Sequence, residues 1–478
     1  MDRLLTKSNH FTEEYCCSVV RIGTLNSVPN SDNLMQTYIN GESIVVNKND
    51  VHEGDVMLYV SNECQIDSVF LCMNNMYGHW ELNINKGEIE RWIEKDSEFL
   101  LSETFKKMKG YFGDNGRVRM IRLRGCPSFG VLFSPKAIEN AYMCLKGINW
   151  ESLVGTDFDM IGETRFVKAY VPPMKSSVRK GESKRLSKWD KFDRMVEGQF
   201  KLHYDTELLK KHLDLFNKDT VIDVTVKMHG TSFICGNVLV NYPKPMFRLR
   251  RMVNKVFKTN ISEFNQDFGM VCSSRKVIKN EWANNKHPEG YYGVDIWTEY
   301  GKIIYPYLPK GVTVYGEICG YLSGESRMIQ KDYDYGCKVG ENFLMIYRIT
   351  EHDEYGLREY SIGEVIMFTN YLIRAMQDAK DENVKRIFNI SNVTLYHKCE
   401  VSELVYDIED LPNALAERCN IEKNEPLCIN KVPREGVVVR IFNDEVPESF
   451  KLKGIKFLEK EKSAIDAGDT DIEMAENL

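Results

Sequence analysis

The sequence predicts a mixed α+β protein, with a β-rich N-terminal part and a larger part in which strands and helices alternate. Its 478 residues are enough for two or three domains. Residues 1–170 hold many short apolar runs separated by turn residues, which is typical of β structure. Residues 201–462 alternate strand-like and helical runs. Between these two parts lies a polar, basic stretch.

The first part, residues 1–170, is predicted to be a small OB-like β-barrel domain. Val56–Val60 and Val118–Leu123 have the composition of strands. Arginines stand at 117, 119 and 122, and Val118 falls on the face opposite to Arg117 and Arg119. A small closed barrel is a common nucleic-acid platform. Another small β fold remains an alternative.

Two charged segments flank the second part. Residues 171–200 form a basic linker that opens at Pro172-Pro173. Its cations are Lys175, Arg179, Lys180, Lys184, Arg185, Lys188 and Lys191. The linker is either a solvated connection or a tether that lies on a phosphate backbone. Residues 463–478 form an acidic tail.

The composition excludes several classes of protein. The 13 cysteines include no Cys-x-x-Cys pair, so neither a zinc ribbon nor a paired disulfide framework is indicated. The N-terminus has no apolar signal region, and no apolar run of 18 residues occurs. We therefore expect a reduced cytoplasmic protein without a membrane partner. A nuclear location or a viral origin is the alternative. Because the net charge is −7, binding to nucleic acid would require local concentration of positive charge.

The most informative motif is Lys227-Met228-His229-Gly230, which follows the strand-like run Val221–Val226. A lysine delivered by a strand into a small-residue turn suits a covalent nucleotidyl carrier, because its amine can attack the α-phosphorus of ATP. The glycine would let the backbone come close to the nucleotide. The pattern is weak alone, because Lys-x-x-Gly also occurs at Lys107–Gly110 and Lys451–Gly454.

Five further motifs follow Lys227 in order. They are Ser274–Lys276, Val314–Gly320, Phe343–Ile349, Arg434–Arg440 and Phe450–Lys453. This ordered set resembles the motifs of the covalent nucleotidyltransferases, which include DNA ligases, RNA ligases and mRNA capping guanylyltransferases. The resemblance covers roughly residues 200–462. It implies an adenylyltransferase domain over 201–462, with ATP-grasp-like antiparallel sheets and helices.

The resemblance also implies roles for individual residues. Lys227, Lys451 and Lys453 would be catalytic. Glu317 would bind the ribose hydroxyls, Glu435 would hold Mg²⁺ or Mn²⁺, and ATP would be the nucleotide. The implied nucleotide-binding residues are Thr225, Val226, Lys227, Gly230, Arg275, Glu317, Phe343, Tyr347, Glu435, Lys451 and Lys453.

Several of these residues also have simpler interpretations. Phe343 and Tyr347 are four apart, so both lie on one face of a strand, where either could stack on adenine or belong to the core. Glu435 stands in an apolar strand and would be costly to bury unless it binds a metal or pairs with Arg434 or Arg440.

Three features favour RNA ligases within this superfamily. His229 occupies the position where DNA ligases and capping enzymes usually have aspartate. Only 25 residues follow Lys453, too few for a C-terminal OB domain. The N-terminal β domain and Lys456–Glu461 resemble the fifth RNA ligase family, which seals RNA 3′-OH and 5′-phosphate ends. We therefore expect nick sealing or RNA repair by a monomer on nicked duplex or broken RNA. A capping-type guanylyltransferase, a DNA ligase-like enzyme and a non-catalytic RNA-binding relative are the alternatives.

Two features depart from that family. Val226 stands where many RNA ligases have glutamate, so a side-chain contact to adenine is missing. The basic segment 244–258 lies where family members often have a plainer loop. This segment is either a surface that tracks RNA, with Phe247 stacking on a base, or an amphipathic helix that faces solvent.

Overall fold

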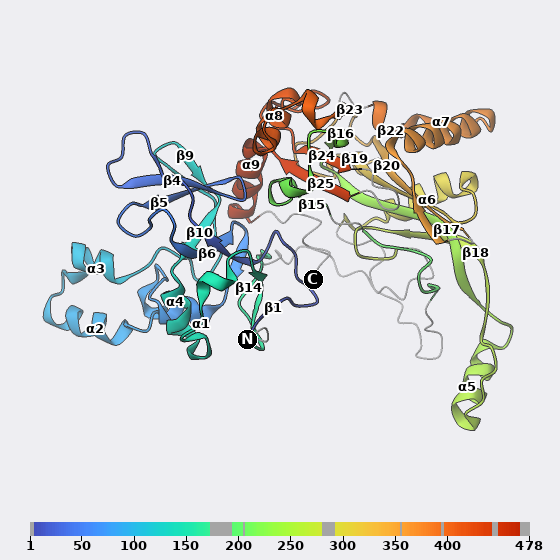
Figure 1. Cartoon of the computed structure of the whole chain (residues 1–478). Coiled ribbons are helices and arrows are strands. Elements are labelled where there is room, and N and C mark those ends of the chain that lie inside the picture. The colour runs from blue at the N-terminus through green and yellow to red at the C-terminus, as the bar shows by residue number, and fades with distance from the viewer. Residues whose placement is uncertain are drawn as a thin grey trace. The chain divides into compact units, whose positions relative to one another are not determined.

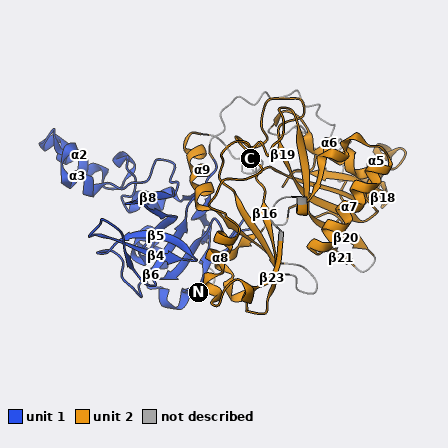
Figure 2. Cartoon of the chain, turned by 90° about the horizontal axis from the view of Figure 1, so that it is seen from above, with its two compact units in different colours: residues 1–171 blue, residues 172–478 orange. Residues whose placement is uncertain are grey.

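The chain divides into two compact units, residues 1–171 and 172–478 (Figure 2). The computed structural model describes residues 4–173, 194–203, 206–279, 292–353, 356–392, 396–441 and 448–468. The linker cations from Lys175 to Lys191 and residues 469–478 of the tail lie outside the described residues. Among the helices in the described ranges, none is both long and apolar enough to cross a membrane.

Unit 1 is mainly β structure. Its strands are β1 (Leu5–Thr6), β2 (Cys17–Arg21), β3 (Asn26–Ser27), β4 (Leu34–Ile39), β5 (Glu42–Asn47), β6 (Val56–Ser61), β7 (Cys64–Ile66), β8 (Ile121–Leu123), β9 (Cys126–Ser128), β10 (Gly130–Phe133), β11 (Asp157–Phe158), β12 (Met160–Ile161), β13 (Thr164–Arg165) and β14 (Val167–Ala169). Its helices are α1 (Ser68–Met73), α2 (Lys86–Lys95), α3 (Glu103–Met108) and α4 (Pro135–Ala141). The predicted strand at Val56–Val60 is confirmed, whereas only Ile121–Leu123 of the second predicted run is a strand.

The predicted closed barrel is not confirmed. Over residues 4–173 the strands pair as five separate sheets, of which the largest has the order β10-β6-β2-β11. β6 pairs on both sides, so Leu58 and Val60 are fully buried in the core of the unit. In the described part of unit 1, core residues therefore pack on this small sheet and not inside a closed barrel.

One predicted basic residue of unit 1 has a different role. Arg117 is buried, and it donates from Nε to Glu63 Oε2 at 2.7 Å and from Nη2 to Glu63 Oε1 at 2.8 Å. Because both groups are desolvated and hydrogen-bonded, this is a structural ion pair. Arg117 does not share an exposed face with Arg119, whose side chain is exposed. The sequence pattern alone could not identify Glu63 as the partner.

Unit 2 contains two larger sheets (Figure 1). Its strands are β15 (Glu207–Leu208), β16 (Val221–Lys227), β17 (Thr231–Pro243), β18 (Phe264–Ser273), β19 (Val312–Gly320), β20 (Asn342–Asp353), β21 (Gly356–Glu359), β22 (Ile387–Asn389), β23 (Tyr396–Glu400), β24 (Gly436–Ile441) and β25 (Glu448–Lys453). Its helices are α5 (Phe247–Phe257), α6 (Ile296–Ile304), α7 (Ile362–Asp378), α8 (Leu411–Arg418) and α9 (Ile455–Asp466). The predicted α+β class with antiparallel sheets is confirmed.

The five-stranded sheet has the order β15-β25-β24-β16-β23. Its apolar residues alternate with polar ones, so Val224, Val226 and Val439 pack in one core with Leu415 of α8 and Phe457 of α9. The residues between them point to the opposite face, because side chains alternate along a strand. Lys227 belongs to this opposite face.

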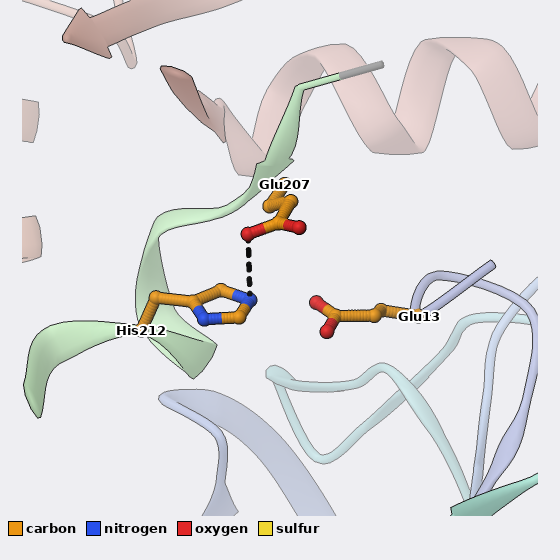
Figure 3. A group of neighbouring side chains, drawn as sticks. All are labelled: Glu13, Glu207 and His212. Carbon is orange, nitrogen blue, oxygen red and sulfur yellow. Dashed lines mark ion pairs between the residues drawn. The ribbon is translucent and has the colours of Figure 1, made fainter. Parts of the chain in front are cut away.

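The edge strand β15 is fixed by a local ion pair. His212 Nε2 lies 3.3 Å from Glu207 Oε2 (Figure 3). The His212 ring also lies against Phe450 of β25, with ring centroids 5.6 Å apart. These contacts anchor residues 207–212 beside β25, with which β15 pairs in parallel. Glu13, also drawn in Figure 3, belongs to unit 1.

The second sheet has the order β18-β17-β19-β20-β21, and β22 pairs with β20. Helices α6 and α7 cover one of its faces, where Trp297 and Leu372 pack with Phe233, Ile318 and Ile346. The uncovered faces of the two sheets face each other. This is shown by a hydrogen bond between the sheets, in which Arg348 of β20 donates to Ser449 Oγ of β25 at 2.9 Å. This inner space between the sheets holds the site described next.

Candidate active site

Lys227 is the last residue of β16 and lies on the inner face of the five-stranded sheet. Its neighbour Val226 is buried in the core on the other face, whereas the Lys227 side chain remains 24% exposed. β16 ends here because the chain turns at Met228–Gly230 and enters β17 at Thr231. The end of β16 therefore places a partly exposed lysine side chain beside the space between the two sheets.

The strand register brings Lys453 beside Lys227. Lys227 pairs with Gly436 of β24, and Gly436 pairs with Lys453 of β25. Paired residues of neighbouring strands point to the same face. Lys451 lies one repeat further along β25, in the row of Val438 and Thr225. The prediction that Lys451 and Lys453 share one face is confirmed by this register.

Glu435 is the buried partner of Lys227. Its Oε1 lies 2.7 Å from Lys227 Nζ, although only 3% of the Glu435 side chain is exposed. Its Oε2 is buried and has no hydrogen-bond partner among the described side chains. His229 Nδ1 lies 3.6 Å from this oxygen, which is too far for a hydrogen bond. One oxygen is therefore paired and the other remains available.

The charges around Glu435 determine its protonation. Burial opposes ionisation of this carboxyl group, but the charge of Lys227, followed by a polar contact with the His229 ring, outweighs the burial. The pKa of Glu435 therefore lies well below its usual range, and the group is an anion at neutral pH. The alternative that Glu435 pairs with Arg434 is wrong, because Arg434 Nε donates to Glu425 at 3.1 Å.

Glu317 and Gly230 hold the turn after Lys227 against β19. The backbone N–H of Gly230 donates to Glu317 Oε1 at 3.1 Å. A Cβ atom at Gly230 would lie 2.3 Å from the carbonyl oxygen of Ile318 and 2.9 Å from Glu317 Cγ. Gly230 therefore allows a close approach to β19, whereas its predicted approach to the nucleotide stays a prediction.

The comparisons with known proteins concern the fold. A scan against models of protein families finds no match, and a search of curated protein sequences also finds none. Among solved structures, a mutant of Naegleria gruberi RNA ligase with AMP and Mn matches with a TM-score of 0.51 at 17% identity, covering 93% of this chain and 98% of that chain. The same ligase with PPi matches with a TM-score of 0.51 at 16% identity, covering 94% and 98%. This chain has the fold of an RNA ligase.

Within this RNA-ligase fold, Glu317, Arg275 and Phe343 gather at one end of the second sheet. β17 pairs antiparallel with both β18 and β19, and β19 with β20. The end of β19 that carries Glu317 therefore adjoins the end of β18 and the start of β20. Arg275 lies in the turn just after β18, and Phe343 pairs with Cys319.

The two candidate aromatic residues differ in their surroundings. Phe343 is 9% exposed, and its ring contacts Phe388 edge-to-face at 5.0 Å between centroids. Tyr347 is half-buried and packs against the same core cluster as Phe343. It lies at a β-bulge, where Tyr315 pairs with Arg348 but Gly316 pairs with Ile346. The more accessible Tyr347 is thus the better placed of the two to meet a ligand.

Sequence reasoning overlooked the segment between β19 and β20, which completes the turn after Lys227. The backbone N–H of His229 donates to the Tyr335 hydroxyl at 2.7 Å, and Gln330 Nε2 donates to the carbonyl of Gly230 at 2.8 Å. Burial raises the pKa of Tyr335, so its hydroxyl stays neutral. In the sequence, this segment is distinguished only by the alternation Asp332-Tyr333-Asp334-Tyr335. Nothing in that alternation indicates that it contacts the turn after Lys227.

Proposed function

We propose that this protein is an ATP-dependent RNA ligase that joins RNA 3′-OH to 5′-phosphate ends through a lysyl-AMP intermediate. The observation that carries the proposal is the position of Lys227, with an accessible amine beside a buried anionic carboxylate and in the same cross-strand row as Lys453. The fold shared with the Naegleria gruberi RNA ligase supports the choice of RNA, and the solved structures of that ligase with ATP and Mn support the choice of nucleotide.

In the first step, the Lys227 amine attacks the α-phosphorus of ATP. The N–P bond forms while the P–O bond to pyrophosphate breaks. A free lysine has a pKa of ~10.4, so only about one amine in 2,500 is neutral at pH 7. The amine must therefore lose a proton, which desolvation together with a nearby metal cation would favour.

In the next two steps, AMP moves to the RNA and then leaves. An oxygen of the RNA 5′-phosphate attacks the same phosphorus, which breaks the N–P bond and forms a 5′-5′ pyrophosphate linkage. The RNA 3′-OH then attacks the 5′-phosphate and releases AMP. Lys451 and Lys453 share one face of β25, where they are placed to stabilise negative charge on the transferring phosphoryl group.

The donor set of the site fits one divalent cation. Mg²⁺ usually takes one or two carboxylates and completes its coordination with water and substrate phosphates. Glu435 Oε2, which is buried without a hydrogen-bond partner among the described side chains, would supply such a ligand. Mg²⁺ or Mn²⁺ there would neutralise phosphate charge. Glu317 would hold the ribose hydroxyls, and Tyr347 or Phe343 the adenine.

We also infer that unit 1 positions RNA through an OB-like surface and that the natural reaction is nick sealing or repair. Deletion of residues 1–171 tests this inference, because labelling by ATP should persist while joining falls. A truncated chain that joins ends as well as the full chain would contradict it.

The decisive experiment follows covalent labelling by radioactive ATP. Lys227→Ala should abolish the labelled adduct, whereas Lys107→Ala should keep it, because Lys107 has the same Lys-x-x-Gly spacing on the exposed face of α3. Labelling with GTP in parallel separates a capping-type enzyme, and ribose or deoxyribose at the 3′-OH end separates a DNA-joining enzyme. An adduct that persists in Lys227→Ala, or that never forms in the unmodified protein, rejects the proposal.

A further inference from the structure

A basic arm projects from the second sheet. β19 pairs with β17 only as far as Gly236, so beyond that point β17 and β18 continue as a ribbon that ends in α5. Figure 1 shows α5 at the far end of this ribbon. We call residues 241–266 the arm. Met195 pairs with Val240 at the base of this ribbon, and the Asn241 N–H donates to the Arg194 carbonyl, so only the outer part depends on packing with α5.

The arm has its own small core, and Phe247 belongs to it. Phe247 is 9% exposed, its ring lies 5.2 Å from that of Phe264, and the Arg251 guanidinium covers it at 4.3 Å. Arg251 also donates to Glu263 at 3.1 Å. The interpretation that Phe247 stacks on an RNA base is therefore wrong, because the ring is already covered. Arg251 has a structural role for the same reason.

The arm concentrates positive charge in a chain whose net charge is −7. Residues 244–263 contain six cationic side chains and one carboxylate, a local balance of +5. The cations are Lys244, Arg248, Arg250, Arg251, Lys255 and Lys258. Such local concentration is what an acidic protein needs in order to bind a polyanion.

The exposed cations form a row along α5. Arg248 and Lys255 are exposed, and with Arg251 between them they follow a spacing of three and four residues, which is one face of a helix, while the exposed Lys258 caps its end. From Arg248 to Lys255 the helix advances ~10 Å, so the row can contact more than one phosphate of a duplex strand.

We propose that the arm binds the phosphate backbone of duplex RNA at a distance from the joining site, an inference that rests on the proposed ligase function. β17 starts one residue after Gly230 and has 13 residues, so α5 lies ~40 Å along the strand from Lys227. A duplex must therefore extend well beyond the joining site to reach the arm. The arm thus favours long duplex substrates over short ones.

An exposed apolar stripe beside the cations offers a competing partner. Leu249, Met252 and Val256 are 48%, 46% and 64% exposed and lie on a second face of α5. A basic amphipathic helix can lie on an anionic membrane. RNA is favoured because the two strands of the arm lead directly to the turns that carry Gly230 and Arg275, so a ligand on the arm is linked to the nucleotide site.

The test compares two variants of the full-length protein. Arg248→Glu/Lys255→Glu/Lys258→Glu reverses the cations, and Leu249→Ser/Met252→Ser/Val256→Ser removes the apolar stripe from the same helix. We expect the charge variant to bind and seal a 40-base-pair nicked duplex at least tenfold less well, with the salt slope of binding reduced by about 3. Sealing of a duplex with six base pairs on each side of the nick should not change. The stripe variant should behave like the unmodified protein.

Several outcomes would overturn the arm proposal. They are unchanged binding and salt slope in the charge variant, equal losses on long and short duplexes, and binding to phosphatidylserine vesicles that the stripe variant loses while RNA binding stays intact. Labelling by ATP is measured in every variant. If the unmodified protein is not labelled by ATP, the ligase function is rejected. The arm proposal is then still tested by how RNA binding depends on duplex length and on salt.

Discussion

Glu435 Oε1 lies 2.7 Å from Lys227 Nζ, where Lys227 ends β16 and Glu435 directly precedes the paired strand β24. The pair joins an accessible amine to a carboxylate that is almost fully buried. Such an arrangement holds the amine in one direction. The second carboxylate oxygen has no hydrogen-bond partner in the described part of the chain, so the pair is not a closed structural salt bridge.

Removing the charge of Glu435 should slow formation of the adduct. Glu435→Gln keeps the shape of the side chain but loses its electrostatic role, so we expect labelling by ATP to fall by about 10²–10³-fold, the size typical of one lost electrostatic contact. Glu400→Gln, an exposed change in β23, is the control and should label normally. Rapid single-turnover labelling at saturating ATP measures the effect, and equal rates in both variants would remove Glu435 from the mechanism.

The low pKa of Glu435 predicts how stability depends on pH. A glutamate in the unfolded chain has a pKa of ~4.3, whereas the folded value lies below the usual range. The contribution of the charged group is therefore fully present above about pH 5 and is lost as the pH falls below the unfolded pKa. Chemical unfolding of the unmodified protein and Glu435→Gln should show a constant difference from pH 5 to 7 that shrinks toward pH 3. A difference that grows with acidity would contradict the assignment.

A second buried ion pair joins neighbouring strands of the second sheet and should matter for stability. Arg348 Nε lies 2.8 Å from Glu359 Oε1, and both side chains are at most 5% exposed. Glu359→Ala leaves the arginine buried without this partner, so we expect a loss of ~3–5 kcal/mol in the free energy of unfolding. Arg358→Ala removes the neighbouring exposed pair with Glu364 and should cost less than ~1 kcal/mol. Denaturant titration of both variants decides, and similar losses would refute the prediction.

Gly230 tests whether the turn after Lys227 needs its close approach to β19. A Cβ at this position would meet the Ile318 carbonyl oxygen at 2.3 Å, so Gly230→Ala must shift the turn or the strand. We expect labelling to fall at least 100-fold, because a displaced turn misplaces the amine. Gly363→Ala adds a Cβ with no atom within 4 Å and is the matched control. Full labelling by Gly230→Ala would show that the approach is dispensable.

The local pattern of the sequence was enough for the strand that carries Lys227, for the shared face of Lys451 and Lys453 and for the α+β class. Each of these depends on residues close in sequence, whose side chains alternate along a strand. The ordered motifs also indicated the relation to RNA ligases that the shared fold supports.

Tertiary structure alone decided which charges meet. It paired Glu435 with Lys227 rather than with Arg434, buried Arg117 against Glu63, and covered Phe247 within the arm. It also brought Tyr335 to the backbone of His229. The physical reason is that pairing between distant segments depends on the register of strands and on which surfaces exclude water, and neither quantity is encoded in the spacing of neighbouring residues.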